Sequence, residues 1–412
     1  MALSKKTYIL LLVLLNGTMF LFGFIENIKG VSYPLIKTEF NASYDDQGKM
    51  ISLLSFGYTF FCVAAGFILA RFGVKKVYLL GFVLLLAGLV LVYFVPDFKT
   101  AAFSLLFVFA SFGLFEIGVN GLATQLFTKK AALLMSILHF FYGAGAVAGP
   151  KLAGIFTDAN GLGFGWRQVY LFSIPLALLF FIPSAAIKFP PPENTENAGQ
   201  EGEAGPKRLG FMGALRDPFV WIFGFALGLM IAIEMVSANW GGLYFQDVYG
   251  VDPRTRGAAF VSAFFILFTV SRLVSGFLIE KIGYMRSLMG AVLFMLIIFA
   301  LGFSLGETGI YVLPGLGFFI AILWPTFVAV GMGRFGKDAA VKTGAMIPIG
   351  GLVNSLIQLA IGYINRYMGA AWGYRSALGF SFVLLLVLFS IRNRVRPGYP
   401  RGAAPPQQGQ GR

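Results

Sequence analysis

The chain has very few of the residues that build disulfides and metal centres. Its 412 residues include one cysteine, Cys62, and one histidine, His139. A single thiol excludes an internal disulfide and a cysteine-ligated metal. One imidazole, with no second histidine and no carboxylate cluster beside it, does not predict a metal site either. We therefore expect no metal, and we interpret Cys62, which lies in an apolar run, as a small core residue.

Sequence signatures of several function classes are missing as well. No nucleotide-binding loop of the Gly-x-x-x-x-Gly-Lys-Ser/Thr type is present, so the sequence does not support a process driven by ATP hydrolysis. No pairing of a nucleophile with a base is found, and we expect neither an enzyme nor an organic cofactor. The net charge of +14 and the pI of about 9.8 would suit nucleic-acid binding. No basic face with interleaved aromatic residues occurs, however, so a nucleic-acid partner is not expected.

Charge is scarce, and apolar residues are abundant. Charged residues make up 12% of the chain and hydrophobic residues 58%, with a mean hydropathy of +0.79. Soluble domains have about 25% charged and about 45–50% apolar residues, so this surplus is too large for a soluble core. The sequence predicts an all-α, multi-pass membrane protein. We expect a monomer whose partners are the lipid bilayer and a small molecule.

Apolar runs of about twenty residues predict twelve membrane helices. Lys5 and Lys6 precede the first run, which we interpret as a retained helix because no small-residue cleavage pattern follows it. The predicted spans are 7–31, 48–70, 76–95, 101–125, 132–156, 167–187, 219–246, 257–280, 287–304, 310–331, 342–365 and 374–391.

The twelve spans form two sets of six. Residues 1–187 are predicted to be an N-terminal bundle and residues 217–392 a C-terminal bundle. The segment 188–216 is rich in proline, glycine and charge and is predicted to be a flexible linker, while 393–412 is predicted to be a disordered tail. Most basic residues lie in the loops on the side of the two termini. Linker, tail and termini are therefore assigned to the cytoplasm, at the cell (inner) membrane.

Two pairs of similar segments relate the halves. GFILARFGVKK (66–76) is similar to GFLIEKIGYMR (276–286), and GWRQVY (165–170) is similar to GYRSAL (373–378). The two pairs have nearly the same offset, which is hard to obtain by chance. The halves are therefore predicted to be pseudo-symmetric repeats, and in transporters built this way the substrate site lies between them near the midplane.

At the first of these pairs the chain resembles the major facilitator superfamily. The family's loop pattern is Gly-x-x-x-Asp-Arg/Lys-x-Gly-x-Arg/Lys-Arg/Lys, and Ala70 stands where its aspartate is expected. In the family this aspartate helps to latch one conformation. The resemblance implies that both loops are gating elements, with an altered latch in the first copy. The matching residues are Gly66, Arg71, Gly73, Lys75 and Lys76 in the first copy, and Gly276, Glu280, Lys281, Gly283 and Arg286 in the second.

A narrower resemblance is to the fucose permease-like sugar:proton symporters. It rests on Gly113, Glu116 and Asn120 in the fourth span and on WPTFVAVGMGRFGKDAAVKTGAMIPIGG at 324–351. It implies transport of a sugar together with protons.

The chain also departs from those symporters at two places. Their first helix carries a carboxylate four residues before a proline, and relative to Pro34 this position is Gly30, with Glu26 one turn earlier. Their sugar-binding amides appear here as Leu138 and Phe141. The second departure implies a substrate that is less polar than a hexose.

Glu116 and Asn120 are the leading site candidates. They lie on one face of a helix, and an ionised group at membrane depth would cost at least ~2.5–3.5 kcal/mol if it faced lipid. We predict that Glu116 faces other helices or a watery cavity and carries the coupled proton. Asn120 is predicted to bind either this carboxyl or the substrate. A buried structural hydrogen bond is the alternative.

Further titratable candidates lie in the first and fifth spans. Glu26 is the second candidate for the proton, and Asn27 beside it is a candidate substrate ligand, although Glu26 and Lys29 are also spaced to neutralise each other. His139 titrates near physiological pH when it is unperturbed. It is a third proton candidate, and Tyr142 near it is a candidate substrate ligand. The alternative for His139 is a neutral histidine bonded to another helix.

The C-terminal half supplies the remaining substrate-binding candidates. In the seventh span a break is predicted near the paired glycines 241 and 242. Glu234 there is expected to meet Arg272, as an ion pair or around a substrate, and Arg272 would also suit an organic anion. Amides and aromatic planes suit a polyol, with helix–helix hydrogen bonds as the alternative. The candidates are Glu234, Asn239, Trp240, Arg272, Trp324 before a break at Pro325, Asn354 and Gln358.

These features predict a secondary active transporter with two rocking halves, driven by the proton gradient and moving a sugar or polyol. Two alternatives stay open. One is a transporter or exporter of an organic anion or amphipathic compound, and the other is a non-transporting membrane sensor with the same fold.

Overall fold

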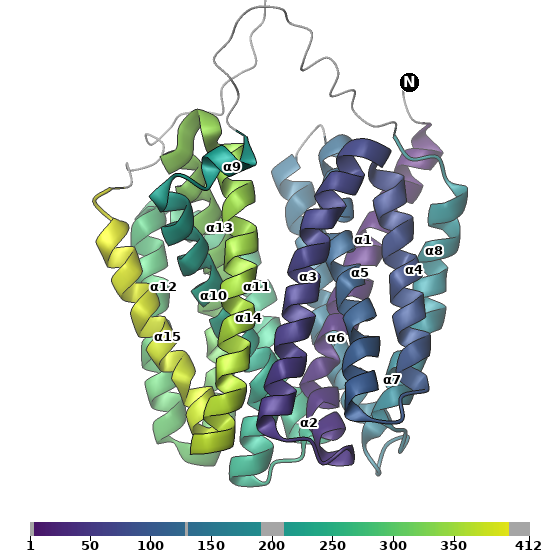
Figure 1. Ribbon diagram of the computed structural model, residues 1–412, viewed down its shortest axis with the longest axis vertical. Helices are drawn as coiled ribbons and strands as arrows, with labels where there is room; N and C mark the ends of the chain where they lie inside the picture. Colours follow the sequence, from purple (N-terminus) through teal and green to yellow (C-terminus); the bar gives the residue numbers. More distant parts are fainter. Residues whose placement is uncertain (1–3, 128–130, 191–209, 395–412) are drawn as a thin grey trace, which may run out of the picture.

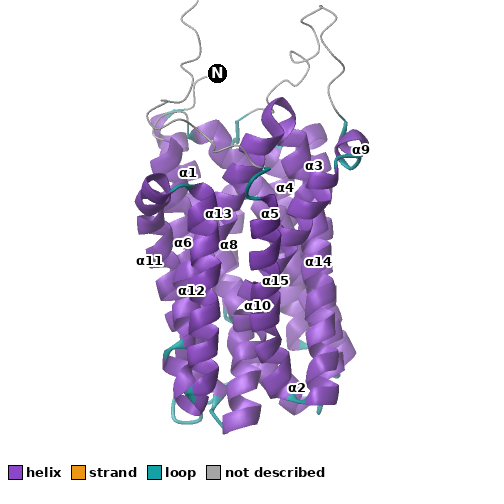
Figure 2. Cartoon of the chain, turned by 90° about the vertical axis from the view of Figure 1, so that its left-hand side faces the viewer, coloured by secondary structure: helices purple, strands orange, loops and turns teal. Residues whose placement is uncertain are grey.

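The computed structural model describes residues 4–127, 131–190 and 210–394. Within these ranges the chain is helical, and no strand is found (Figure 2). The helices run nearly parallel and form two bundles that stand side by side (Figure 1).

The N-terminal bundle contains the first six membrane-spanning units. Two of them are broken: α1 and α2 form the first, and α7 and α8 form the last. The helices are α1 (Lys5–Asn27), α2 (Lys29–Glu39), α3 (Tyr44–Phe72), α4 (Val74–Tyr93), α5 (Phe98–Leu126), α6 (Ala131–Thr157), α7 (Trp166–Leu171) and α8 (Ser173–Ala186).

The C-terminal bundle contains the other six units, and a four-residue helix precedes it. Short π and 3-10 turns lead into three of its long helices. The elements are α9 (Phe211–Ala214), α10 (Pro218–Tyr249), η2 (Pro253–Gly257), α11 (Ala258–Ile282), α12 (Tyr284–Ser304), η3 (Gly306–Tyr311), η4 (Leu313–Gly315), α13 (Leu316–Phe335), η5 (Gly336–Asp338), α14 (Ala339–Met368) and α15 (Ala370–Ile391).

The structure confirms the predicted all-α membrane fold. Eleven segments of the described chain are long and apolar enough to cross a membrane. The twelfth is α6, which has 27 residues and packs between α1 and α11. Since about twenty residues suffice to span the hydrocarbon layer, α6 takes the fifth place in the N-terminal bundle.

Four local predictions are corrected. The first span extends to Glu39 and breaks at Ile28, whereas the prediction ended it at residue 31. The sixth span is split at Phe172. The expected breaks in the seventh and tenth spans are absent: α10 continues through both glycines, and α13 continues through Pro325. Neighbouring helices hold these backbones in place, which propensity alone does not reveal.

The two similar loops begin and end helices in the same way. Gly73 ends α3 and begins α4 with φ +80°, and Gly283 ends α11 and begins α12 with φ +96°. Only glycine adopts such angles without strain. The repeated glycine of the sequence pattern is therefore explained by a tight turn that occurs once in each half.

The two ends of the molecule differ in what they carry. The end with the start of α1, the end of α8 and α9, at the top of Figure 1, is called the linker end. The opposite end, with α2 and the start of α3, is called the far end. Residues 191–209 of the predicted linker and 395–412 of the predicted tail lie outside the described residues.

The bundles meet along three pairs of helices: α3 with α14, α6 with α11, and α2 with α10. At the far end, α3 and α14 touch backbone to backbone. A Cβ on Gly48 would lie 2.7 Å from the Cα of Gly362, and a Cβ on Gly362 would lie 2.6 Å from the Cα of Gly48. Any side chain at either position would push the two bundles apart.

Candidate functional site

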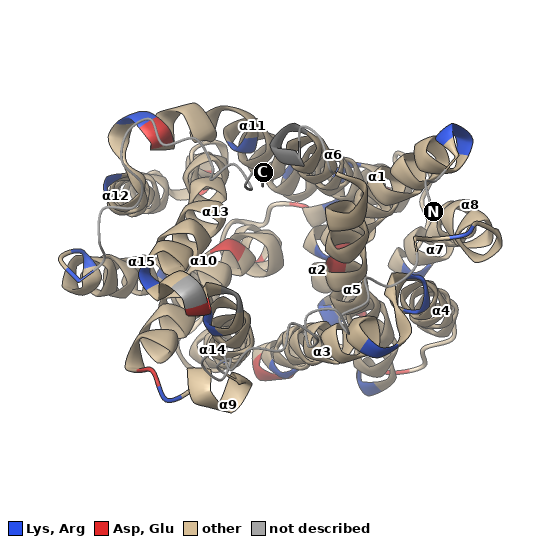
Figure 3. Cartoon of the chain, turned by 90° about the horizontal axis from the view of Figure 1, so that it is seen from above, with Lys and Arg blue, Asp and Glu red and all other residues tan. Residues whose placement is uncertain are grey.

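Five charged side chains meet at mid-depth between the bundles, and we call them the central charge cluster. The N-terminal bundle contributes Glu26, Lys29 and Glu116, and the C-terminal bundle contributes Glu234 and Arg272. Glu116 and Glu234 each interact electrostatically with Glu26 and Arg272, so charges of one bundle interact with charges of the other. Seen from the linker end, α10 has acidic positions on the side that faces the other bundle (Figure 3).

Helix packing does not fully bury most of the side chains of the cluster. Glu116 lies in α5. In the most apolar 18-residue stretch of this helix 72% is buried, which is the highest fraction among the eleven candidate spans. Glu26, Glu116 and Glu234 are nevertheless partly exposed, while most of their neighbours along the helices are buried; Arg272 is partly exposed as well. Since residues of both bundles act on one another here, these partly exposed side chains lie at the boundary between the bundles.

Lys29 contacts both bundles, although it is almost fully buried. Its Nζ lies 3.1 Å from Oε1 of Glu26, 3.5 Å from Sδ of Met235 in α10, and 5.5 Å from the centre of the Phe109 ring in α5. The predicted pairing of Glu26 with Lys29 is confirmed. The contact with Met235 was missed, because no periodicity in a sequence relates residues of two different bundles.

Glu26 is held by two donors. Tyr142 of α6 donates its hydroxyl hydrogen to Oε2 at 2.7 Å, while Lys29 occupies Oε1. The structure therefore brings together two predicted site residues from different helices. Asn27, which was also predicted to bind substrate, is buried and donates to the carbonyl of Gly23 at 2.9 Å.

Glu116 and Asn120 are in contact, as their spacing predicted. The amide nitrogen of Asn120 lies 3.1 Å from Oε1 of Glu116 and 2.7 Å from its main-chain oxygen. One oxygen of this carboxylate therefore has a neutral donor. A neutral amide stabilises an ionised carboxylate less than an ammonium group does.

Arg272 and Glu234 do not form the expected ion pair. Nη1 of Arg272 lies 3.4 Å from Nδ1 of His139 across the boundary between the bundles, and its guanidinium lies 4.4 Å from the centre of the Phe268 ring. Glu234 accepts no hydrogen bond from any residue of the described ranges. His139 therefore bonds to another helix, the alternative considered for it, and its partner is a cation.

The four polar candidates of α10 and α14 bind one another. Oε1 of Gln358 accepts from Nε1 of Trp240 at 2.8 Å and from the amide of Asn239 at 3.4 Å. The amide nitrogen of Gln358 donates to Asn354 at 3.2 Å. All four are buried. This network joins two helices of the C-terminal bundle, and Trp324, which is half-buried in α13, takes no part in it.

In the ranges that the structure describes, the predicted gating loops make polar contacts only within their own halves. Lys75 donates to the carbonyls of Ala185 and Ile187 at 2.8 and 2.7 Å, and so caps the end of α8. A Cβ on Gly66 or Gly276 would meet nothing within 4 Å. Among the described residues, the other charged positions of the two loops form no ion pair across the halves; they are Arg71, Lys76, Glu280, Lys281 and Arg286.

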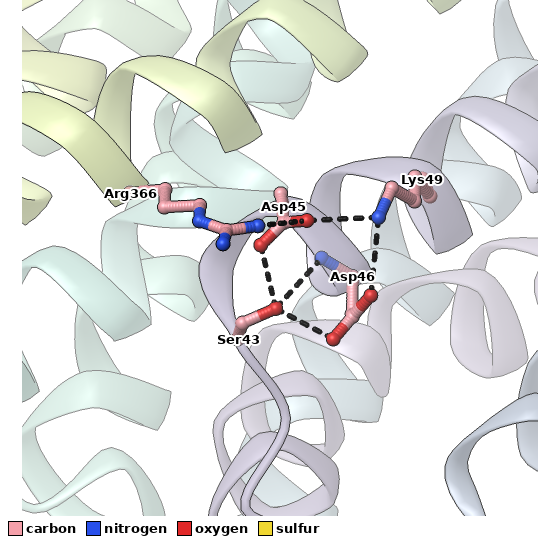
Figure 4. A network of polar contacts seen from close by, with 5 residues as sticks. All are labelled: Ser43, Asp45, Asp46, Lys49 and Arg366. Carbon is pink, nitrogen blue, oxygen red and sulfur yellow. Dashed lines mark hydrogen bonds and ion pairs between the residues drawn. The ribbon is translucent and has the colours of Figure 1, made fainter.

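Charge pairs join the bundles at the far end instead. Figure 4 shows Asp45 of α3 between Lys49 of its own helix, at 2.8 Å, and Arg366 of α14, at 2.7 Å. Ser43 donates to Asp45 at 2.6 Å and begins the helix by accepting from the backbone of Asp46. We call the pairing of Asp45 with Arg366 the far-end latch.

A second far-end contact lies between α2 and α10. Asp247 accepts from Lys37 at 3.3 Å and from the hydroxyl of Tyr44. In the part of the chain that the structure describes, the polar contacts between the bundles run from this end to Arg272, and none joins the linker-end loops. The structure is therefore closed at the far end, and no polar contact between described residues joins the two bundles at the linker end.

Comparison with known proteins supports the arrangement of the helices. A sequence model of the Major Facilitator Superfamily matches residues 15–342. A putative glucose/galactose transporter of Helicobacter pylori strain 26695 is 23% identical over 397 residues, which cover 87% of this chain and 90% of the relative. Bypass of stop codon protein 6 of Saccharomyces cerevisiae is 24% identical over 288 residues; the match covers 63% of this chain and 55% of the yeast protein.

Solved structures have the same fold. The fucose:proton symporter FucP of Escherichia coli superposes with a TM-score of 0.61 at 17% identity, covering 93% of this chain and 99% of the symporter. A D-xylose-proton symporter superposes with a TM-score of 0.71 at 15% identity, covering 93% of this chain and 97% of that one. At such identities the likeness is one of fold.

Proposed function

The chain belongs to the Major Facilitator Superfamily and is a membrane transporter rather than an enzyme, and from this premise we propose that it moves a sugar or polyol together with protons by alternating access. The observation that carries this proposal is the central charge cluster. Three carboxylates from both bundles meet at the boundary between the bundles, with only two cations in the cluster. A carboxylate that takes up a proton there changes the charge balance between halves that must rock against each other.

The sugar class is supported by likeness and by chemistry. Two structures of the same fold are symporters named for fucose and xylose, and one relative is named for glucose and galactose. The amide–indole network of Gln358 with Trp240 supplies donors, acceptors and an aromatic plane within the C-terminal bundle. Directional hydrogen bonds and a stacking surface are what a polyol requires.

The orientation follows from charge. The basic residues of the linker end have few acidic partners, whereas far-end acids such as Glu39, Asp45 and Asp247 accompany the basic residues there. We propose that the linker end is cytoplasmic, at the cell (inner) membrane, by the positive-inside rule. The structure then represents the state that is open to the cytoplasm.

The test is uptake by reconstituted protein. A thermal-shift screen of sugars, polyols, organic acids and amphiphiles on purified protein selects the compounds, and proteoliposomes with an imposed pH gradient then measure accumulation of those that bind. We expect gradient-driven accumulation of a sugar or polyol. Glu116→Gln should abolish accumulation and leave exchange intact, while unchanged accumulation would remove Glu116 from the coupling role.

A second candidate substrate is an organic anion. Arg272 favours it, since the guanidinium has no carboxylate partner in the described residues and contacts only His139 and the Phe268 ring. Guanidinium groups bind carboxylates in a two-pronged geometry. If the screen selects organic acids and Arg272→Ala abolishes their binding while neutral sugars never bind, the anion is the substrate.

A further inference from the structure

The three carboxylates of the central charge cluster differ in how well their ionised forms are stabilised. Glu26 has an ammonium and a hydroxyl donor, at 3.1 and 2.7 Å. Glu116 has one amide donor, at 3.1 Å. Glu234 has no donor among the described residues. A partly buried carboxylate without a donor is the one that gains most from binding a proton, because protonation removes the charge that lacks compensation.

Water can reach Glu234. On α10 the residues Ile231, Glu234 and Met235 are partly exposed and lie on one helical face, while every residue from 236 to 245 is buried. Several side-chain polar atoms of the described residues are fully buried and have no hydrogen-bond partner. Neither carboxylate oxygen of Glu234 is one of them. The neighbouring Met235 touches Lys29 of the other bundle, so this face lies at the boundary between the halves.

The charged and titratable groups around Glu234 come from four helices. Glu234 interacts electrostatically with Arg272 of α11, Glu26 of α1 and Lys29 of α2. It also interacts electrostatically with Tyr142 of α6. Both cations are engaged elsewhere, Lys29 with Glu26 and Arg272 with His139. Lys29 is buried in contacts on three sides, whereas Arg272 has one weak polar contact. Arg272 is therefore the cation that is free to move.

We propose that Glu234 is a proton-binding site of the transporter and that Arg272 alternates between Glu234 and His139. When Glu234 holds a proton, Arg272 rests on His139 and so joins α11 to α6 across the two halves. When the proton leaves to the water, the ionised carboxylate draws Arg272 into a pair within the C-terminal bundle, and the contact across the halves is lost.

This exchange links proton binding to the movement of the bundles. It deepens the proposed proton coupling and rests on it, but it assigns the proton to the C-terminal half. Glu116 and Glu26 then act through their charge rather than as the proton carrier. His139 and Arg272 are positioning residues, because they act on the proton site without binding the proton.

Infrared difference spectroscopy tests the assignment without any substrate. The carbonyl band of a protonated carboxyl is recorded in purified, reconstituted protein as the pH is stepped. We expect one titrating band that disappears in Glu234→Gln and persists in Glu116→Gln, with both variants eluting as monodisperse protein. A band that persists in Glu234→Gln, one that disappears in Glu116→Gln, or no titrating band in the wild type would overturn the assignment.

Two further variants test the alternation. Arg272→Ala removes the competing cation and should raise the midpoint pH of the band by roughly one unit. His139→Gln removes the other resting place of Arg272 and should lower the midpoint. Midpoints that stay unchanged in both variants would contradict the exchange. If the band behaves as expected but uptake does not depend on the pH gradient, the coupling proposal fails and the proton site stands.

Discussion

The far end and the linker end of the boundary between the bundles are held by different interactions. At the far end, opposite charges pair between the halves and two glycines bring α3 and α14 into backbone contact. At the linker end, each half satisfies its own charges: Lys75 caps α8, and Lys342 pairs with Asp217 at 2.8 Å. The same pair of bundles is thus joined at one end and independent at the other.

This difference shows how the far end can open while the buried Asp45 keeps one of its partners. Asp45 is shielded by Arg366 of the other half and by Lys49 of its own helix. When the bundles separate, Arg366 leaves and Lys49 remains. At the latch, the cost of opening is therefore the loss of one partly exposed ion pair, which is about 1 kcal/mol or less. The contacts of Asp247 with Lys37 and Tyr44 and the glycine contact are lost in addition.

The largest change in the difference between the two ends is expected from a side chain placed in the contact between Gly48 and Gly362. Gly48→Leu places a side chain against the Gly362 backbone, and overpacking of about 1–3 kcal/mol should lower the population closed at the far end roughly tenfold or more. The measurement is maleimide labelling of Ser355→Cys, a buried residue of α14, in a Cys62→Ala background. Labelling should become faster.

The matched control for this variant lies at the other end of α3. Gly66→Leu adds the same side chain where a Cβ meets nothing within 4 Å. It should leave the labelling rate unchanged. Equal acceleration in both variants would show that the leucine disturbs α3 in general rather than the far-end contact.

A smaller effect should follow from removing the far-end latch. Arg366→Gln breaks the pair between the halves and leaves Asp45 with Lys49, so labelling at position 355 should rise about fivefold, as the loss of about 1 kcal/mol requires. Lys49→Met removes the partner within the helix and keeps the pair across the halves. If Lys49→Met accelerates labelling as much as Arg366→Gln, the pair with Arg366 is not what holds this end closed.

Removing a charge pair at the linker end should change the thermal stability of the protein rather than the rate at which the far end opens. Partial burial raises the pKa of Asp217, but hydrogen bonds from Lys342 and from the backbone of Phe219 lower it more, so the net pKa lies below the usual 3.8. A lowered pKa adds stability above pH 3.8, and this stability is lost as the pH falls through the folded-state pKa.

Lys342→Met should accordingly lower the melting temperature by about 2 °C or less at neutral pH. The difference from wild type should shrink as the pH falls below 3.8, and labelling at position 355 should not change. A temperature difference that stays constant down to acid pH would exclude the pairing of Asp217 with Lys342 as its source.

The smallest effect is expected from salt. Raising ionic strength from 0.1 M to 1 M shortens the screening length from about 10 Å to about 3 Å. The Arg366 side chain is 49% exposed, so the latch should weaken and labelling of the wild type should rise by less than about twofold. Arg366→Gln should respond less than the wild type. An equal response would attribute the salt effect to something other than the latch.

Contacts along one helix were predictable, because helical periodicity is a local property. The pairs Glu26–Lys29, Glu116–Asn120 and Asn354–Gln358 were read from spacings of three and four residues, and each is a contact in the structure. Contacts between helices were not predictable in this way. The expected pairing of Glu234 with Arg272 is absent, although both residues were correctly placed near each other.

The predicted helix breaks failed for a related reason. The paired glycines of α10 were taken as a weak point, yet they serve close packing: a Cβ on Gly242 would lie 2.8 Å from the carbonyl oxygen of Gly30. A glycine that weakens an isolated helix also permits the approach of a neighbour. The sequence alone does not distinguish these two uses.

The sequence by itself determined the membrane class, the twelve spans and the division into two similar halves. Apolar length and the need to satisfy backbone hydrogen bonds within lipid act on each segment separately, so they can be read residue by residue. Only the tertiary structure decided which end is closed, that Lys29 reaches Met235, and that Asp45 meets Arg366. These contacts join segments hundreds of residues apart, and they exist only once the two bundles have packed against each other.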